Sequence, residues 1–395
     1  MNVGSNEEGS DPPDAGRAAA GPLRGLRVVE IAGIGPGPFC GMMLAGLGAE
    51  VLRIERPGAD AFGQSAVLNR GRPALALDLK SPAGADALLG IIEKADALFE
   101  GFRPGVMERL GLGPETCLSR NPRLVYGRVT GWGQEGPFAQ AAGHDLNYLA
   151  LSGMLWPLGP AERPPLPPLN LVADFGGGGM LLLVGLLSAL LEARISGRGQ
   201  VVDAAMVDGA ASLGAMIFGW VGSGSWRLER ETNMLDGGAP FYAVYETADG
   251  GWVSIGALEP HFYRRLLQEL GLDEARFANQ WNRDSWPALK QALAATFRAK
   301  TRESWCRAFE GIDVCFAPVL DPLEAAAHPH AKARQAFFQA GGVAQPSPAP
   351  RFSRTPATPS PGTAPAQSHD PFALLRRWRV EGDVSPLAPG SPPRP

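Results

Sequence analysis

The pattern that most restricts how this chain can fold is an early succession of strand, loop, helix and strand. The β-rich run Leu26–Ile31 leads directly into a glycine and proline loop, Gly33–Pro38, which is followed by a helical stretch, Phe39–Leu47, and a second strand, Val51–Glu55. Such a βαβ unit joins two parallel strands, and its crossover is almost always right-handed. Because a glycine loop at a helix N-terminus can hold a phosphate, the pattern predicts an α/β protein whose ligand lies near this loop.

A nicotinamide dehydrogenase is the first enzyme class that this pattern suggests. Glu55 ends the second strand, where an acid that binds a ribose would lie. The loop, however, reads Gly-x-Gly-x-Gly with Pro36 and Pro38 after its second and third glycines, and Arg56 follows Glu55 directly. The dinucleotide interpretation is therefore weak.

Strands and helices continue to alternate over the first half of the chain. Ser81 and Pro82 form the start signal of the next helix. The further elements expected here are the helix Ala83–Lys94 and the strands Ala95–Glu100, Leu124–Val129 and Gln200–Ala205. This alternation predicts a largely parallel sheet whose ligand-binding loops follow the carboxyl ends of the strands.

The kind of secondary structure that the sequence predicts changes from about Trp226. Phe241–Glu246 and Trp252–Gly256 flank Asp249-Gly250, which is a strong hairpin signal. Helices are expected at His261–Leu270, Trp286–Ala299, Arg302–Phe309 and, late in the chain, Phe372–Trp378. We therefore expect a disordered tail (1–20), a large domain (21–225), a small α+β domain (226–335), an extended return to the large domain (336–380) and a disordered end (381–395).

Composition excludes several classes of protein. Of 395 residues 45% are hydrophobic and 19% charged, which allows a sizeable core, and the net charge of −4 argues against a nucleic-acid or membrane partner. The 4 cysteines lack CxxC spacing and the N-terminus lacks a signal peptide, so an intracellular, cytoplasmic protein is expected. The most apolar run, Met180–Leu191, is shorter than the ~20 residues of a membrane span and is interpreted as a buried helix.

One imidazole and one carboxylate are the candidate catalytic groups. His144 lies in Gly143-His144-Asp145, and Asp174 opens a segment with four glycines, each at the start of a helix-like stretch. Two titratable groups of different type near one site suit acid–base chemistry. From spacing alone, a helix cap at Asp145 and an unrelated histidine would be the commoner outcome. The other histidines show no ligand spacing beyond His328-Pro329-His330, so no metal site is expected.

Several motifs in order along the chain resemble those of the class III (CaiB/BaiF-type) CoA-transferases. They are Gly25–Glu30, Gly35-Pro36-Gly37, Gly48–Val51, Asp78-Leu79-Lys80, Arg103-Pro104-Gly105 and Thr130–Gly133. Gly143-His144-Asp145, Asp174–Gly178 and Gly256–Pro260 resemble in particular the α-methylacyl-CoA racemases of that family. The resemblance covers roughly Gly21 to Thr355. It implies an α/β fold with a Rossmann-like large domain, a smaller α+β domain, and two chains interlinked as a homodimer.

The resemblance also implies roles for individual residues. His144 and Asp174 would be the acid/base pair, and Glu259 would hydrogen-bond the imidazole. Arg56, Lys80 and Arg109 match positions that hold the CoA nucleotide, although solvated strand ends are the commoner fate of such residues. The other implied contacts to the acyl-CoA are Ile34, Leu77, Gly101, Phe102, Arg103, Pro104, Gly105, Val106, Gly143, Asp145, Leu146, Asn147 and Tyr148. Ala173 departs from the family, in which a glycine is common before the aspartate.

The implied reaction is a 1,1-proton transfer at Cα of a 2-methylacyl-CoA through an enolate, with CoA as part of the substrate and no cofactor or metal. The alternative is CoA transfer between acids with Asp174 as covalent nucleophile. Against it, the small domain has only Asp236-Gly237-Gly238 where transferases resemble one another in a longer glycine lid, and covalent transfer does not require His144. A non-catalytic CoA-binding paralogue is disfavoured by the joint presence of His144, Asp174 and Glu259.

Overall fold

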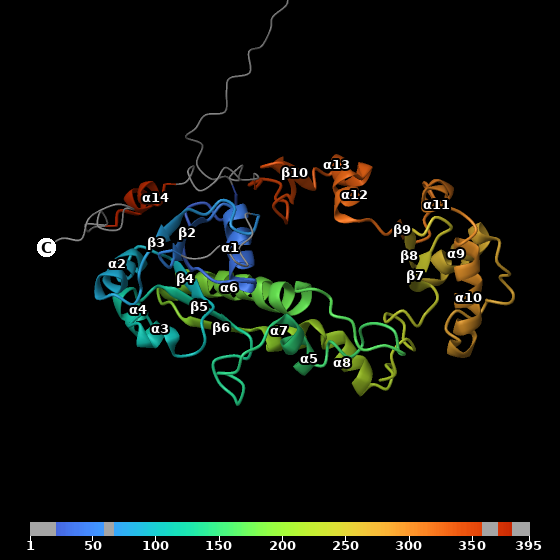
Figure 1. Cartoon of the computed structure of the whole chain (residues 1–395), viewed down its shortest axis with the longest axis horizontal. Coiled ribbons are helices and arrows are strands. Elements are labelled where there is room, and N and C mark those ends of the chain that lie inside the picture. Colours follow the sequence, from blue (N-terminus) through green and yellow to red (C-terminus); the bar gives the residue numbers. More distant parts are fainter. Residues whose placement is uncertain (1–20, 59–66, 358–369, 381–395) are drawn as a thin grey trace, which may run out of the picture.

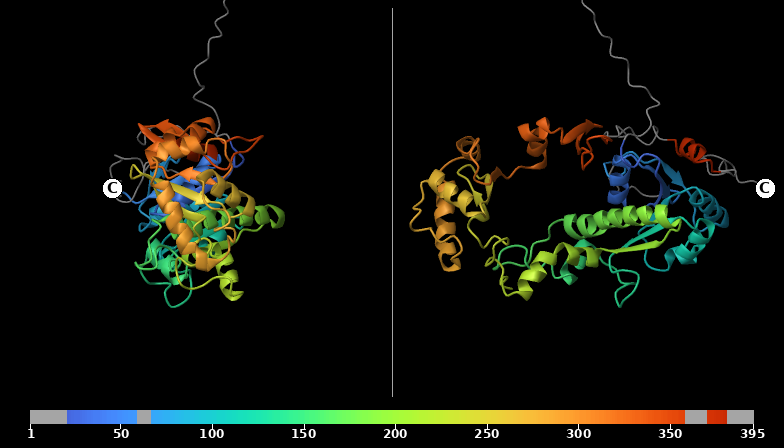
Figure 2. Two further views of the ribbon diagram at one scale, coloured as in Figure 1. Left: turned by 90° about the vertical axis from the view of Figure 1, so that its right-hand side faces the viewer. Right: turned by 180° about the vertical axis from the view of Figure 1, so that it is seen from behind.

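The computed structural model describes residues 21–58, 67–357 and 370–380, so the expected disordered segments 1–20 and 381–395 lie outside the described residues. The chain forms two separate bodies at opposite ends of an elongated molecule, joined by two connecting segments (Figure 1). Figure 2 gives the same separation from behind. We call the body with the six-stranded sheet the large domain and the body with the three-stranded sheet the small domain.

The large domain confirms the predicted parallel α/β sheet. Its strands are β1 (Arg27–Ile31), β2 (Glu50–Glu55), β3 (Ala74–Ala76), β4 (Ala97–Glu100), β5 (Val125–Thr130) and β6 (Val201–Ala205). Their order is β3-β2-β1-β4-β5-β6, and every pairing is parallel. This is the doubly wound order, in which the winding direction changes between β1 and β4. Strand β3 was not predicted, because a strand of three residues is too short to show a hydrophobic periodicity.

Alternating side chains of the strands fill two cores, one on each face of the sheet. Val28 of β1 faces the core that includes Leu44 and Leu182, whereas Val29 and Ile31 face the other. The first core is covered by α1 (Pro36–Gly46) and α6 (Leu181–Ser196), and the second by α2 (Pro82–Ile92), α4 (Pro114–Arg120) and α14 (Pro371–Trp378). The end of the chain thus packs on the large domain.

Helix α1 begins earlier than predicted. Phe39 was the expected first residue, but the helix starts at Pro36, after Gly35 with φ 68°. A proline fits the first helical turn because its missing N–H has no partner there in any case. The glycine loop is consequently shorter than the sequence suggested, and Gly35 lies directly at the helix start.

Asp174 lies in the first turn of a π-helix, η1 (Leu171–Met180), so the predicted helix-like stretch begins at Leu171 rather than at Asp174. The glycine run explains how η1 fits between α1 and α7 (Met206–Leu213). A Cβ on Gly177 would lie 2.7 Å from the backbone nitrogen of Ala210, and one on Gly179 would lie 2.8 Å from the carbonyl oxygen of Pro36. Small residues therefore let three helices approach closely around the candidate carboxylate.

The interpretation of the apolar run as a buried helix is only half correct. Helix α6 buries Leu182 and Leu186 against the sheet, but its other face exposes Val184, Leu191 and Ile195, the last to 89%. Within the described part of the chain, Leu171–Ser196 is the one stretch long and apolar enough to cross a membrane by length and composition, with mean hydropathy 1.7. Its packing on the sheet accounts for one apolar face.

The small domain contains the predicted hairpin. Strands β7 (Tyr242–Glu246) and β8 (Trp252–Gly256) pair antiparallel, and β9 (Phe316–Pro318), which was not predicted, pairs with β8. The helices that complete it are α9 (Pro260–Leu270), η2 (Arg283–Ser285), α10 (Trp286–Phe297) and α11 (Arg302–Ala308). Its core is separate from those of the large domain and is rich in aromatic side chains, among them Phe241, Phe297 and Trp305.

The remaining helices of the large domain are α3 (Val106–Arg109), α5 (Asp145–Leu151) and α8 (Ala215–Gly222). The return from the small domain contains α12 (Pro322–Ala327), α13 (Pro329–Ala333) and a hairpin of β10 (Phe337–Ala340) and β11 (Val343–Pro346). An extended return was expected here, so the hairpin is a correction. The indole N–H of Trp378 donates to Glu50 at 2.7 Å, which fixes α14 to β2.

Candidate active site

The loops that follow the strands all lie along one edge of the sheet, because all six strands are parallel. Gly33–Gly35 follows β1, Arg56 follows β2, and Leu77 and Lys80 follow β3. The segment 101–106 follows β4, next to β1 in the sheet. The winding change between these two strands is where a doubly wound sheet opens a crevice for ligands.

His144 and Asp174 meet at this edge through the first turns of two helices. His144 is the N-cap of α5, and its backbone N–H donates to Asn147 Oδ1 at 3.1 Å. The buried carboxylate of Asp145 accepts the backbone N–H of Asp174 at 2.6 Å. A Cβ on Gly35 would lie 3.0 Å from Asp174 Oδ2, so the absence of a side chain there gives the carboxylate its space.

The environment of Asp174 adjusts its acidity toward neutrality. Burial and, as the second cause, the nearby charge of Asp145 raise the pKa of Asp174 to about 6, against the opposing effects of a hydrogen bond from Asn170 and the charge of His144. A carboxyl group with this pKa can give or take a proton near neutral pH. The charge of His144 is among the influences on this carboxyl, so the two candidate residues lie near each other.

Tyr148 packs the segment 143–148 against the loop after β5. Its hydroxyl donates to the carbonyl oxygen of Gly143, and its ring packs edge-on against Trp132 at 4.7 Å. Burial raises the pKa of Tyr148, the charge of Asp174 raises it further, and the charge of Arg103 lowers it. Arg103, Tyr148 and Asp174 therefore share one electrostatic environment.

The predicted CoA contacts are arranged along the same edge. Arg56, Lys80 and Arg109 are exposed, and Leu77 is buried with its backbone N–H on the carbonyl oxygen of Glu55 at 2.8 Å. In the segment 101–106, Gly101 and Arg103 are exposed and Pro104 is buried. Ile34 is 58% exposed beside Gly35. Their role in binding CoA stays a prediction.

Glu259 is not brought to His144 within one chain. It is the N-cap of α9 in the small domain, whereas α5 belongs to the separate large domain (Figures 1 and 2). The segment before Glu259 is held rigidly, because Gln280 Nε2 donates to the carbonyl oxygens of Ala257 at 3.1 Å and Leu258 at 2.8 Å. Within the single chain, Glu259 is therefore not the hydrogen-bond partner of His144 that the resemblance implied.

Three features of the site were not predicted. Asn170 bonds to the Asp174 side chain, and its position four residues earlier is a helical spacing that could have indicated it. Gln140 Nε2 donates to the carbonyl oxygen of Pro104 at 3.1 Å. An apolar cavity of about 360 Å³ lies between α7, α8 and the segment 154–159, and its lining includes Met154, Leu158, Val172, Leu213, Trp226 and Leu235. No sequence pattern indicates the Gln140–Pro104 hydrogen bond or the cavity.

Metal-ligating side chains do not cluster in the described residues. Across 21–58, 67–357 and 370–380, no group of three or more His, Cys, Asp or Glu side chains could hold a metal ion.

The fold is a doubly wound sheet, with the candidate residues His144 and Asp174 and several exposed basic residues near the loops that follow its strands. The chain matches CoA-transferase family III over residues 23–370 and belongs to that family. It is 48% identical to the mouse α-methylacyl-CoA racemase over 357 residues, which are 90% of this chain and 93% of that protein. It is 47% identical to the human α-methylacyl-CoA racemase, covering 86% of this chain and 88% of that protein.

Solved structures agree with this assignment. A CaiB/BaiF family protein from Brucella suis matches 92% of this chain and all of its own length with a TM-score of 0.77 and 26% identity. The Mycobacterium tuberculosis protein Rv3272 matches 87% of this chain and 96% of its own with a TM-score of 0.73 and 28% identity. The expected family is thus confirmed, and the mixed α/β architecture is common to these structures.

Proposed function

We propose that this protein is an α-methylacyl-CoA racemase, which interconverts the (2R) and (2S) epimers of 2-methylacyl-CoA thioesters. The observation that carries the proposal is the Asp174 carboxyl, with a pKa of about 6, in the same site as His144. The similarity to two racemases across most of the chain supports it. The acyl-CoA needs no further cofactor for this chemistry.

The proposed mechanism is proton removal on one face of Cα and proton return on the other. One group of the pair takes the α-proton, and the thioester enolate that forms is then protonated by the second group, which inverts the centre. The roles exchange in the opposite direction. The backbone N–H groups of Asp145 and Leu146, at the first two positions of α5, have no acceptor within their own helix and are suited to bind the enolate oxygen.

The surroundings of the pair suit the rest of the substrate. Arg56, Lys80 and Arg109 are cations along one edge, as the phosphates of CoA require. The segment 101–106 would line the pantetheine and thioester, together with Gly143–Tyr148. The apolar cavity between α7, α8 and the segment 154–159 has the volume and lining for a branched acyl chain. We also propose that the protein is cytoplasmic.

The test is NMR in D₂O of a (2S)-2-methylacyl-CoA with the protein and no acceptor acid. Deuterium at Cα together with growth of the 2R epimer is the expected result. In His144→Ala, Asp174 can still exchange the proton that faces it, so exchange without inversion is expected. Asp174→Asn should lose inversion as well.

CoA transfer is the second candidate, because relatives such as the acetyl-CoA:oxalate CoA-transferase of Acetobacter aceti, 32% identical, carry out that reaction. Asp174 would then attack the thioester carbonyl and form a mixed anhydride. CoA passing to an added carboxylate, with no deuterium at Cα, would replace the racemase by this function.

We further propose that the active protein is an interlinked homodimer in which Glu259 of one chain reaches His144 of the other. Helix α8 supports this, because none of its residues is buried and Met216, Phe218 and Val221 are exposed. The exposed face of α6 is a second apolar surface without cover in the single chain. Such surfaces are typical of subunit interfaces.

Complementation tests this arrangement. His144→Ala and Glu259→Ala, each of low activity alone, are co-expressed with different affinity tags so that the mixed dimer can be purified. If Glu259 acts across the interface, one of the two sites in the mixed dimer is intact and about half of the wild-type activity returns. A mixed dimer no more active than its parents would show that Glu259 does not act across the interface.

A further inference from the structure

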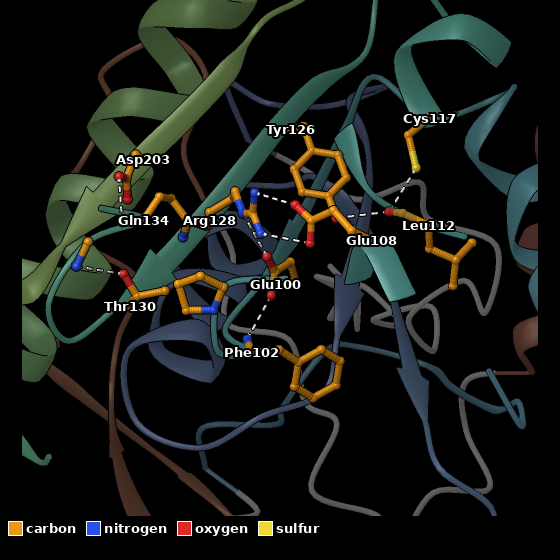
Figure 3. Close-up of polar contacts among 12 residues, drawn as sticks. Glu100, Phe102, Glu108, Leu112, Cys117, Tyr126, Arg128, Thr130, Gln134 and Asp203 are labelled. Atoms are coloured by element: carbon orange, nitrogen blue, oxygen red, sulfur yellow. Dashed lines mark hydrogen bonds and ion pairs between the residues drawn. The ribbon is translucent and has the colours of Figure 1, made fainter. Parts of the chain in front are cut away.

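A buried charged cluster lies directly beneath the segment 101–106. Glu100, the last residue of β4, is completely buried, and Arg128 lies opposite it in the register of β5. The third member, Glu108, belongs to α3 and is partly exposed. Figure 3 shows the Arg128 side chain between the two carboxylates.

Each carboxylate has a distinct task in this cluster. Glu100 Oε2 accepts the backbone N–H of Phe102 at 2.6 Å, and Glu100 Oε1 accepts Nε–H of Arg128 at 3.1 Å. The two terminal nitrogens of Arg128 donate to the two oxygens of Glu108, at 2.8 and 3.3 Å. One guanidinium from β5 therefore holds residues at both ends of a single loop, 100–108.

The loop held in this way carries the exposed groups expected to meet the substrate. Gly101 and Arg103 lie between the two carboxylates in sequence, and Arg109 directly follows Glu108. Gly105 has φ 82°, and a Cβ there would lie 3.1 Å from a guanidinium nitrogen of Arg109, so loop shape and the position of Arg109 are coupled. A shift of the loop would move both Arg103 and Arg109.

We propose that Glu100, Arg128 and Glu108 are positioning residues for the acyl-CoA, which hold the loop 101–106 and Arg109 in the conformation that binds the CoA moiety. The inference rests on the proposed function in one respect, namely that this loop contacts CoA. It assigns the three residues no contact with the reacting atoms.

The energetics favour a geometric role over a stabilising one. Burial raises the pKa of Glu100 to about 7 against the opposing effects of the Phe102 N–H and Arg128. A buried ion pair of this kind is often no more stabilising than apolar residues of similar size. Its directional bonds do, however, fix one loop conformation, which apolar packing does not.

The experiment measures the affinity for free CoA by calorimetry, together with kcat, KM and thermal unfolding. Glu100→Gln keeps the shape of the side chain but places an amide against Arg128, and Glu108→Gln weakens the other arm at a partly exposed site. We expect the Kd for CoA and the KM for the acyl-CoA to rise about tenfold in Glu100→Gln and about threefold in Glu108→Gln. The kcat at saturation should change much less than KM.

The matched control is Glu324→Gln, which breaks the pair between Arg302 of the small domain and Glu324 of the return segment and should leave CoA affinity unchanged. Folded Glu100→Gln and Glu108→Gln proteins that bind CoA as the wild type does would overturn the positioning role, even if their stability falls. If Glu100→Gln does not fold, Glu108→Gln decides alone. A wild-type protein that fails to bind CoA overturns the proposed function itself.

Discussion

The acid limb of the pH profile should report the ionisation of Asp174, and the charge of Asp145 should shift that limb. The Asp145 charge can be removed with little change in the shape of its side chain. In Asp145→Asn the amide oxygen can still accept the backbone N–H of Asp174, so the first turn of η1 keeps its anchor. Only the negative charge beside the Asp174 carboxyl is lost. The pKa of Asp174 should fall as a result, because a like charge nearby disfavours ionisation.

The size of the effect follows from the causes of the raised pKa. The pKa of Asp174 rises from an ordinary 3.8 to about 6, with burial as the largest cause and Asp145 as the second. Since burial remains in the variant, the pKa should fall by about 1 at most, which corresponds to about 1.4 kcal/mol. The acid limb of kcat/KM should move from about pH 6 toward about pH 5, while the alkaline limb moves less.

The assay is the initial rate of epimerisation from each pure epimer between pH 4.5 and 9. Because the equilibrium constant of the reaction does not depend on pH, both directions must shift equally, which is an internal check. Asp96→Asn is the matched control, because it removes one negative charge at the opposite edge of the sheet, where Asp96 accepts the N–H of Arg27. An unchanged acid limb in folded Asp145→Asn would refute the assignment of that limb to Asp174.

Three further predictions concern the same scaffold. Ionised Asp174 is disfavoured in the folded state, so the free energy of unfolding should fall as pH rises from about 4 to 6. Urea unfolding should show Asp174→Asn to be more stable than the wild type at pH 7 by about 1 kcal/mol, after allowance for solvent screening, and not at pH 4. Gly35→Ala places a methyl 3.0 Å from the Asp174 carboxylate at a φ of 68°, and should cost roughly tenfold or more in epimerisation rate with a smaller change in unfolding. Trp378→Ala removes a buried indole and its hydrogen bond to Glu50, and should lower the free energy of unfolding by about 3–5 kcal/mol, with kcat retained in the folded fraction. A loss of unfolding free energy below about 1 kcal/mol would mean that α14 does not stabilise the large domain.

Much of the fold could be predicted from local sequence pattern. The βαβ unit, the later strands and the hairpin at Asp249-Gly250 each have a periodicity or turn signal that acts over fewer than a dozen residues. Two of the strands that were missed, β3 and β9, are three residues long and exist because of pairing with strands distant in the sequence. Short edge strands of this kind are determined by tertiary context.

The candidate site divides in the same way. His144 and Asp174 could be named because each lies beside glycines in a recognisable motif, and the resemblance to a family gave them roles. The π-helical setting of Asp174 and the approach of Gly35 depend on how α1, η1 and α7 pack, which no local pattern encodes. The cluster of Glu100, Arg128 and Glu108 joins two strands and a helix, so it too could only be found in three dimensions.

The difference between a racemase and a transferase on this fold then depends on His144 more than on Asp174. A carboxylate that is half-buried beside Gly35 can serve as a nucleophile or as a base, and its raised pKa fits proton transfer without excluding attack on a thioester. A second proton-transferring group is useful only for inversion, because covalent CoA transfer needs one nucleophile and no base on the opposite face of Cα. His144 is therefore the feature that favours epimerisation. It is the N-cap of α5, its side chain is exposed, and its charge affects the pKa of the Asp174 carboxyl.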